Sequence, residues 1–289
     1  MPEFKVPPEL DGVSVRTFLR RHCGVSSRLL AKLKRVENGM TVNGCLIRSI
    51  DALHAGDELV LRFPEDDPEI EPVELPLSIV YEDSAIIVLD KPPFMPVHPV
   101  RSHQRDTLAN GVMFYFQSRG ERVTFRPVNR LDRDTSGLVL AAKSSYAHTF
   151  LSGSTKKKYT ALCEGEITES GTVDAPIMLC PGSIMQRCVG EGGVRAVTHY
   201  KPLMTVYGHT LLELELETGR THQIRTHMSF IGHPLAGDDM YGGSRRIFSR
   251  QCLHCSEMEL IHPLTHEKMI LRSLPEDWTG ILEKHFKNE

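Results

Sequence analysis

The sequence predicts an α+β protein, in which a larger domain has a mixed, largely antiparallel sheet and a small N-terminal domain is of α/β type. In the larger part, apolar strand patterns follow one another around short turns, with helices between some of them, which is typical of α+β folds. Residues 64–76 contain four prolines and six carboxylates, a composition that favours neither a helix nor a central strand. We therefore expect domains over residues 1–64 and 77–289, joined by an acidic, proline-rich linker over 65–76.

Composition places the chain among soluble globular proteins. Its 289 residues are 40% apolar and 25% charged, and no apolar run reaches the roughly 18 residues that a membrane span needs. The first residues lack a charged-then-apolar signal pattern, and seven scattered cysteines fit reduced thiols better than a disulfide framework. We expect a cytoplasmic protein without membrane contact. A net charge of −3 gives no global argument for nucleic-acid binding, so any such argument must be local.

The N-terminal part reads as a small basic module. A first helix with Leu19 is predicted over residues 17–21, leucines recur at helical spacing over 28–34, and Asn43-Gly44 gives a hairpin turn before the strand pattern of residues 58–63. Residues 12–36 contain no acid but seven cations: Arg16, Arg20, Arg21, Arg28, Lys32, Lys34 and Arg35. Two basic helices and a hairpin form a compact surface for phosphate contacts. The alternative is a solvated pair of amphipathic helices.

The larger part alternates strand patterns with helices. Strands are predicted over residues 77–83, 85–92, 138–143, 158–165, from 199 onward and over 210–217, with helices over 107–116 and 144–151. Threonine and serine at the starts of the two helices are favourable caps. The chain has none of the glycine-rich motifs for nucleotide cofactors and no HExxH zinc motif.

Asp132 lies in the most informative segment, residues 130–140. In this segment a mostly charged stretch leads to a turn of small residues, which is followed by an apolar strand. A carboxylate at such a position needs charged partners, and Arg130 and Arg133 flank it in the sequence. This pattern indicates a carboxylate held ionised for catalysis. The alternative is an aspartate that only caps the turn, a role that Asp134 could also fill.

Three further segments carry candidate chemistry. In residues 218–228, a helix opening at the Thr-Gly turn would place Thr221, Arg225 and Met228 on one face, with Arg225 free to pair with a carboxylate in a cleft. Lysines over 156–158 run into Tyr159, a pattern that suits phosphate contact and base stacking or, alternatively, an exposed edge. Residues 231–243 form a glycine-rich loop of the kind that shapes sites. Neither the histidines nor the nearby cysteines have metal-site spacing, so no metal is expected.

Together these segments resemble the RluA family of pseudouridine synthases. The resemblance rests on residues 130–138, 158–161, 219–227 and 232–242 in that order, with flanking motifs at 89–93, 98–99, 253–254 and 262–263. It covers residues 77–275. The N-terminal part in turn resembles an S-four-like RNA-binding domain, named for a small-subunit ribosomal protein.

The resemblance implies an enzyme that isomerises uridine to pseudouridine in structured RNA, either ribosomal or transfer RNA, without metal or organic cofactor. Asp132 would be the catalytic aspartate, attacking the sugar or removing a ribose proton, and Arg225 would pair with it. Tyr159 would stack on the target base and assist loss of the proton from the new attachment carbon. Arg130 would hold the flipped-out nucleotide, and Ile224 would pack beside the base.

The S-four-like resemblance, together with the local charge, assigns RNA contacts to cations of the N-terminal domain, namely Arg16, Arg20, Arg28, Lys32, Lys34 and Arg35. Action as a monomer is the simplest expectation for a two-domain RNA modifier. Two positions depart from the family pattern: Asn129 stands where histidine is usual before the Arg-Leu-Asp run, and Phe94 stands where glycine is common. Asn129 can hydrogen-bond but cannot titrate near neutrality.

Two other classes of function compete with this interpretation. One is an RNA-binding or ribosome-assembly protein without catalysis, which would use the basic module alone. The other is a small-molecule or metal-dependent hydrolase that uses Asp132, Asp238 and the histidines.

Overall fold

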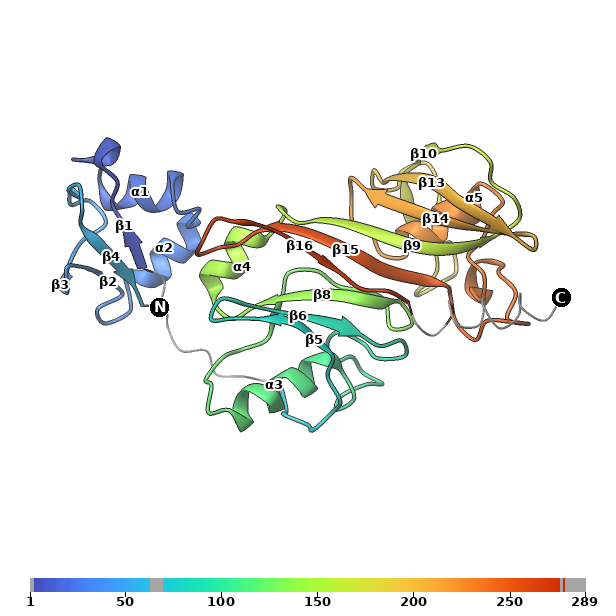
Figure 1. Cartoon of the computed structure of the whole chain (residues 1–289), viewed down its shortest axis with the longest axis horizontal. Coiled ribbons are helices and arrows are strands. Elements are labelled where there is room, and N and C mark those ends of the chain that lie inside the picture. Colours follow the sequence, from blue (N-terminus) through green and yellow to red (C-terminus); the bar gives the residue numbers. More distant parts are fainter. Residues whose placement is uncertain (1–2, 63–69, 276–277, 279–289) are drawn as a thin grey trace.

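The computed structural model describes residues 3–62, 70–275 and 278, and it separates a small N-terminal module from a larger sheet domain (Figure 1). In residues 3–62 the module contains one short 3-10 turn, two helices and four strands, in the chain order β1 (Glu3–Lys5), η1 (Pro8–Leu10), α1 (Val15–Arg21), α2 (Ser27–Leu33), β2 (Met40–Val42), β3 (Cys45–Leu46) and β4 (Glu58–Leu61). Its antiparallel sheet has the order β1-β4-β2-β3. Ser14 and Ser26 cap the two helices by accepting backbone N–H groups, which explains why α1 begins two residues before the predicted start.

The module shares its apolar core with the larger domain through α4 (Ser145–Leu151). Tyr146 of α4 is fully buried in the cluster that the module's helices and strands form. Its ring meets that of Phe4 edge-on, with centroids 5.4 Å apart, and its hydroxyl donates to the carbonyl of Pro263. The module is therefore packed against the end of the sheet domain rather than tethered beside it (Figure 1).

Half of the expected linker is bound to a helix of the larger domain, α3 (Leu108–Ser118). Residues 65–69 lie outside the described part of the chain. In the remainder, the amide of Val73 donates to the carbonyl of Asn110, and the Asn110 side chain donates to the carbonyl of Glu71. The segment from residue 70 is extended, as its prolines predict, but it is fixed to α3. The domain boundaries at 64 and 76 stay predictions.

A large mixed sheet organises the second domain. Its strands lie in the order β10 (Gly171–Asp174), β13 (Val197–Val206), β14 (His209–Leu216), β9 (Lys156–Glu164), β15 (Leu253–Ile261), β8 (Ser136–Ala142), β6 (Ile86–Lys91) and β5 (Ile79–Glu82), with β16 (Lys268–Arg272) on β15 and β7 (Arg126–Pro127) on β8. Within the described residues only β8 and β15 pair in parallel. This confirms the predicted α+β class with a mixed, largely antiparallel sheet. A separate hairpin joins β11 (Ile177–Leu179) and β12 (Arg187–Val189).

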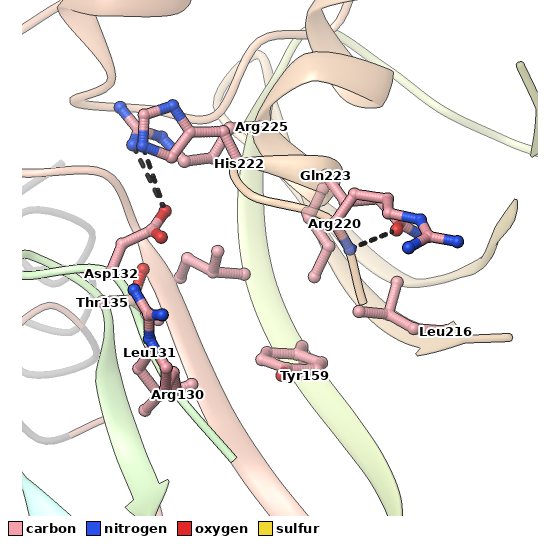
Figure 2. A pocket seen from close by; sticks show the side chains of 12 residues that line it. Arg130, Leu131, Asp132, Thr135, Tyr159, Leu216, Arg220, His222, Gln223 and Arg225 are labelled. Atoms are coloured by element: carbon pink, nitrogen blue, oxygen red, sulfur yellow. Dashed lines mark hydrogen bonds and ion pairs between the residues drawn. The ribbon is translucent and has the colours of Figure 1, made fainter. Parts of the chain in front are cut away.

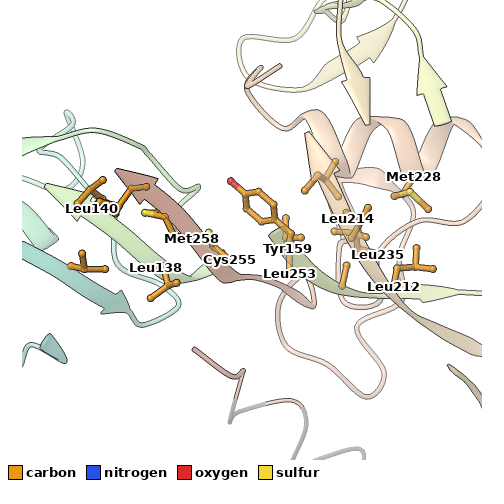
Figure 3. Packing of buried hydrophobic residues seen from close by; sticks show 14 of the residues in the cluster. Leu138, Leu140, Tyr159, Leu212, Leu214, Met228, Leu235, Leu253, Cys255 and Met258 are labelled. Carbon is orange, nitrogen blue, oxygen red and sulfur yellow. The ribbon is translucent and has the colours of Figure 1, made fainter. Parts of the chain in front are cut away.

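Helices lie on both faces of the sheet, and the strands β6 and β8 are almost entirely buried. On one face, Ile87 and Val139 pack against Val112 and Phe116 of α3. On the other face a second cluster extends from Leu138 and Leu140 across β15 and β9 to α5 (Gln223–Phe230) (Figure 3). All seven residues of β8 are buried as a result. In the part of the chain that the structure describes, no helix has both the length and the apolar character that a membrane crossing requires.

The start of α5 differs from the sequence prediction. The helix begins at Gln223, because His222 has the left-handed backbone conformation with φ of 58°. Thr221 therefore lies before the helix, and it does not share a helical face with Arg225 and Met228. The side chain of Gln223 fixes this turn by accepting from the amide of Arg220 and the hydroxyl of Thr218.

Candidate active site

The loop before β8, the strand β9 and the start of α5 meet around one pocket (Figure 2). Five residues that the sequence pointed to line it: Arg130, Asp132, Tyr159, Ile224 and Arg225. The other lining residues are Leu131 and Thr135 of the same loop before β8, Leu216 and Leu253 at the ends of β14 and β15, Arg220 and His222 of the loop before α5, and Gln223 at the start of α5. Segments more than a hundred residues apart in the chain thus form a single polar pocket with an apolar wall.

Asp132 and Arg225 face each other across this pocket. Nη1 of Arg225 donates to Oδ2 of Asp132 at 3.3 Å. The Asp132 side chain is 27% exposed, whereas that of Arg225 is 7% exposed. The carboxylate is therefore open toward the pocket, and the guanidinium behind it is enclosed.

Asp238 is the closer partner of Arg225. Its two oxygens accept from Nε at 2.6 Å and from Nη2 at 2.8 Å, and its side chain is 1% exposed. This bidentate pair occupies one edge of the guanidinium and leaves Nη1 for Asp132. Asp238 is thus engaged in holding Arg225, which argues against the hydrolase interpretation that used it as a reacting group.

The charges around Arg225 do not cancel. Burial alone would lower the pKa of Arg225, but the hydrogen bonds and charge of Asp238, and then the charge of Asp132, raise it above its usual value. The ring of Tyr241 adds a cation–π contact, 4.9 Å from the guanidinium carbon. One cation between two carboxylates leaves the cluster with an excess negative charge, and the exposed Asp132 is the carboxylate that carries it into the pocket.

His222 is a neighbour of Asp132 that the sequence reasoning considered only as a metal ligand. Its Nδ1 is hydrogen-bonded to the hydroxyl of Tyr241 at 2.8 Å, and its Nε2 lies 3.8 Å from Oδ2 of Asp132. Burial lowers the pKa of His222, although the charge of Asp132 opposes the shift. A ring that is neutral at physiological pH therefore stands beside the carboxylate.

The arginine that follows Asp132 has a different partner from the one its position suggested. Arg133 donates from Nε and Nη2 to the two oxygens of Asp134 at 2.7 and 2.9 Å. The idea that Arg130 and Arg133 together hold Asp132 ionised is therefore wrong for Arg133. The side chains of residues 133 and 134 pair with each other, and the amide of Thr135 closes the turn on the carbonyl of Asp132.

Buried cations hold the same turn from behind. The fully buried Lys91 donates to the carbonyls of Pro92, Met95 and Arg133 at 2.7–2.9 Å. Burial, and then the charge of Arg250, lowers the pKa of Lys91 to about 7. Arg250 donates to the carbonyl of Asp134 at 3.0 Å. Two consecutive carbonyls after Asp132 are thus fixed by the core.

A chain of hydrogen bonds continues from Arg250 into the sheet. Arg250 donates to the hydroxyl of Ser136, which lies 2.9 Å from Nδ1 of His254. Nε2 of His254 meets the hydroxyl of Ser273 at 3.0 Å, and that hydroxyl donates to Asp90. Arg250 donates at one end of this chain and Asp90 accepts at the other. Both ring nitrogens of His254 are occupied in this way.

Tyr159 lines the pocket, and Asn129 ties the loop before β8 to that strand. Burial, and then the neighbouring Cys255, raises the pKa of Tyr159 well above its usual value, so the phenol keeps its proton at neutral pH. Asn129 donates to the carbonyl of Leu138 and accepts from the amide of Leu140. Here asparagine bridges the loop to β8, a role that needs a donor and an acceptor but no titration.

The remaining predicted RNA contacts lie elsewhere. Arg16, Arg20, Lys32, Lys34 and Arg35 are exposed on or next to α1 and α2, at the opposite end of the molecule from α5 (Figure 1); the side chain of Arg28 lies outside the described residues. In the lysine run, Lys158 forms ion pairs with Glu213 and Glu215, both at 3.3 Å. That lysine is therefore not free for phosphate, as the run alone had suggested.

No metal site accompanies the pocket. Within residues 3–62, 70–275 and 278, no group of three or more histidine, cysteine, aspartate or glutamate side chains is placed to hold a metal ion.

Comparison with known proteins gives a consistent set of similarities. Residues 85–230 match the model of a family described as RNA pseudouridylate synthase. The chain is 42% identical to an uncharacterized RNA pseudouridine synthase, YjbO, of Bacillus subtilis (strain 168), over 90% of this chain and 95% of that protein. It is 40% identical to the ribosomal large subunit pseudouridine synthase D of Pseudomonas aeruginosa, over 89% and 86%. Among solved structures, human RNA pseudouridylate synthase domain containing 1 matches with a TM-score of 0.59 and 26% identity, over 73% of this chain and 89% of that one.

Proposed function

The chain belongs to the RNA pseudouridylate synthase family, and we propose that it converts uridines of structured ribosomal RNA with Asp132 as the catalytic residue. Membership of this family makes the protein an enzyme that isomerises uridine to pseudouridine in RNA. One observation carries the assignment of residues: the exposed carboxylate of Asp132 faces the enclosed Arg225 in a pocket that Tyr159 also lines. An RNA-binding protein without catalysis has no use for this arrangement.

Isomerisation breaks one bond and makes one. The bond from ribose to a ring nitrogen of uracil is cleaved, the base turns, and a ring carbon bonds to the same ribose. That carbon loses its proton and the freed nitrogen gains one, so substrate and product have the same atoms. Asp132 can serve either by attacking the sugar or by removing a ribose proton, and both roles require an ionised, accessible carboxylate.

The geometry around Asp132 suits such a role. Arg225 directs the carboxylate with a single hydrogen bond of 3.3 Å and does not neutralise it, because Asp238 has taken the other edge of the guanidinium. His222 is neutral beside it for the reason given above. Asp132 is thus oriented from one side while its charge remains available to the substrate.

The other pocket residues are proposed to hold the base. A uridine in folded RNA must leave its stack to reach Asp132. Tyr159 presents a ring for stacking, Ile224 adds an apolar contact, and the exposed Arg130 can bind the phosphate of the flipped nucleotide. Because its phenol keeps its proton, Tyr159 can assist proton loss from the ring carbon as a hydrogen-bonding group but not as a phenolate.

Ribosomal RNA is the proposed substrate class. The Pseudomonas relative at 40% identity carries a name that assigns it to the large ribosomal subunit. Such a substrate implies action in the cytoplasm. The pocket is built from a single chain, which supports action as a monomer. Transfer RNA, the alternative from the sequence, is tested by mapping pseudouridines in both RNA classes from cells with and without the protein.

A direct assay of the reaction follows from its chemistry. The ring carbon that bonds to ribose loses its hydrogen, so RNA labelled with tritium at that carbon should release tritium to water when the purified enzyme acts. A metal chelator should leave the release unchanged, since the proposed steps use side chains alone. Loss of the activity on chelation would favour the metal-dependent alternative.

The N-terminal cations are proposed to bind the phosphate backbone of the same RNA. Replacing Lys32 and Lys34 with glutamine should weaken RNA binding. The plot of the logarithm of the binding constant against the logarithm of salt concentration should become less steep, by about one unit of slope per lost contact. Deleting residues 1–64 is a poorer test, because it would uncover Tyr146. An unchanged salt slope in the double variant would remove RNA binding from the module.

A further inference from the structure

We propose that the N-terminal module carries a second RNA site, a pocket that binds one unpaired nucleobase of the RNA. This inference rests on the proposed contact between the module and RNA, and it adds base recognition to what was so far a backbone contact. It assigns a ligand to a cavity that the catalytic site does not use.

The pocket lies where α2 meets the hairpin of β2 and β3. It has a volume of about 400 Å³, within the range of sites that accept a small ligand. Leu33 and Met40 belong to its lining and to the buried core of the module. Leu46 and Ile50 also line it and are 71% and 63% exposed. A basic module that presents two large apolar side chains beside a cavity has an apolar ligand surface there.

Arg48 supplies a flat polar surface in the same lining. Its guanidinium donates to Asp51 through Nε and Nη2, with distances of 2.9–3.3 Å, and its side chain is still 77% exposed. The amide of Arg48 donates to the same carboxylate. The guanidinium plane is therefore fixed in orientation while its face stays open, which is the geometry on which an unstacked base can lie.

Charge at the mouth identifies the occupant as RNA. Lys34 lines the pocket, and Lys32 and Arg35 are exposed close to it in the chain. Within the described residues none of these three cations forms an ion pair. An apolar cavity with an oriented guanidinium and unpaired cations at its edge complements a nucleotide, whose base is apolar on its faces and whose phosphate is anionic. An apolar protein segment would match the cavity but not the cations.

Two RNA probes separate the pocket from the backbone contact. One is a blunt RNA duplex, and the other is the same duplex with a short single-stranded extension that contains 2-aminopurine. The full-length protein should bind the extended probe about thirtyfold more tightly, the mid-range effect of one stacked base, and should quench the 2-aminopurine. Fluorescence anisotropy at several salt concentrations gives affinity and salt slope together.

Substitution of Leu46 and Ile50 by serine should abolish the preference for the extended probe and leave both the duplex affinity and the salt slope unchanged. Arg48→Lys should reduce the preference, because it keeps the charge but loses the plane. The matched control replaces Leu203 and Met204, which are 51% and 54% exposed on β13, with serine. Both double variants change exposed positions, and thermal unfolding curves establish that each variant is folded.

The proposal is overturned if the Leu46 and Ile50 variant keeps the same preference for the extension as the Leu203 and Met204 control. It is also overturned if wild-type protein binds the two probes equally. Failure of the proposed function would look different: the lysine-to-glutamine double variant would then keep the wild-type salt slope on both probes, or tritium release would be absent.

Discussion

Asp238→Asn is the substitution for which the structure predicts the largest effect outside the reacting groups. Asp238 is buried and makes two charge-assisted hydrogen bonds to Arg225. Removing one member of a buried ion pair costs about 3–5 kcal/mol, mostly because the remaining charge loses its compensation. Asparagine keeps one acceptor oxygen, so we expect a loss near the lower end, about 3 kcal/mol.

That loss is large enough to measure by thermal unfolding. For a chain of 289 residues, with an unfolding entropy of about 2.1 cal/mol/K per residue, about 3 kcal/mol corresponds to a fall in Tm of roughly 5 °C. Turnover should also fall, because Arg225 is then free to move toward Asp132 and to pair with it one to one. Misplacement of a catalytic group by about 1 Å can cost about a hundredfold in rate, and we expect tritium release under saturating RNA to fall by that order.

The neighbouring Asp239→Asn is the matched control. Asp239 is 56% exposed and pairs with Arg245 at the surface, so its loss should change the unfolding free energy by no more than about 0.5 kcal/mol. Equal melting temperatures and equal turnover for the two variants would refute the account of Asp238 as the residue that fixes Arg225.

Two further predictions concern the loops behind the pocket. The pKa of Lys91 is about 7 in the folded chain, below its ordinary value of 10.5. Between these two pH values the unfolded chain binds more protons than the folded chain. The unfolding free energy therefore increases with pH, by at most about 1.4 kcal/mol per pH unit. Lys91→Met removes this component, so the difference in unfolding free energy between wild type and variant should grow from pH 7 to pH 9 in urea titrations; parallel curves would contradict it. Phe94 has φ of 64° and is 54% exposed, so Phe94→Gly should raise the unfolding free energy by about 0.5–1 kcal/mol, whereas Phe94→Ala should not; equal values for the two variants would show that no strain is stored there.

The parts that sequence could predict are those that depend on local pattern or on ordered motifs. Strand and helix positions followed from periodicity and caps, and Asp132, Tyr159 and Arg225 followed from motifs whose order matched a family. The structure brings those three residues to one pocket. The positive φ at Phe94 also gives a physical reason for the glycine that is common at that position.

The parts that sequence could not predict are pairings between distant segments. Nothing near Asp132 in the chain indicates that Lys91 and Arg250 hold its turn, 42 and 116 residues from the carbonyls they bind. Arg133 is adjacent to Asp132 but points to Asp134, since adjacency in sequence does not fix side-chain direction. Asp238, an acid within the glycine-rich loop of residues 231–243, was the available signal for a partner of Arg225.

The packing of the N-terminal module against the larger domain could not be predicted from the sequence either. The proline-rich stretch predicts a stiff, extended linker between two separate domains, yet Tyr146 of the larger domain completes the core of the module. A tyrosine in a short helix has no local pattern that distinguishes an interdomain contact from an ordinary core position.

The central claim is that the carboxylate of Asp132 carries out the chemistry. Asp132→Asn keeps the size of the side chain and an acceptor for Nη1 of Arg225, but it removes the charge. Tritium release from labelled RNA and RNA affinity should be measured on the same preparation of this variant and of wild type. We predict that the variant loses release while its RNA affinity stays within a few-fold of wild type. Full turnover by the variant would contradict the mechanism.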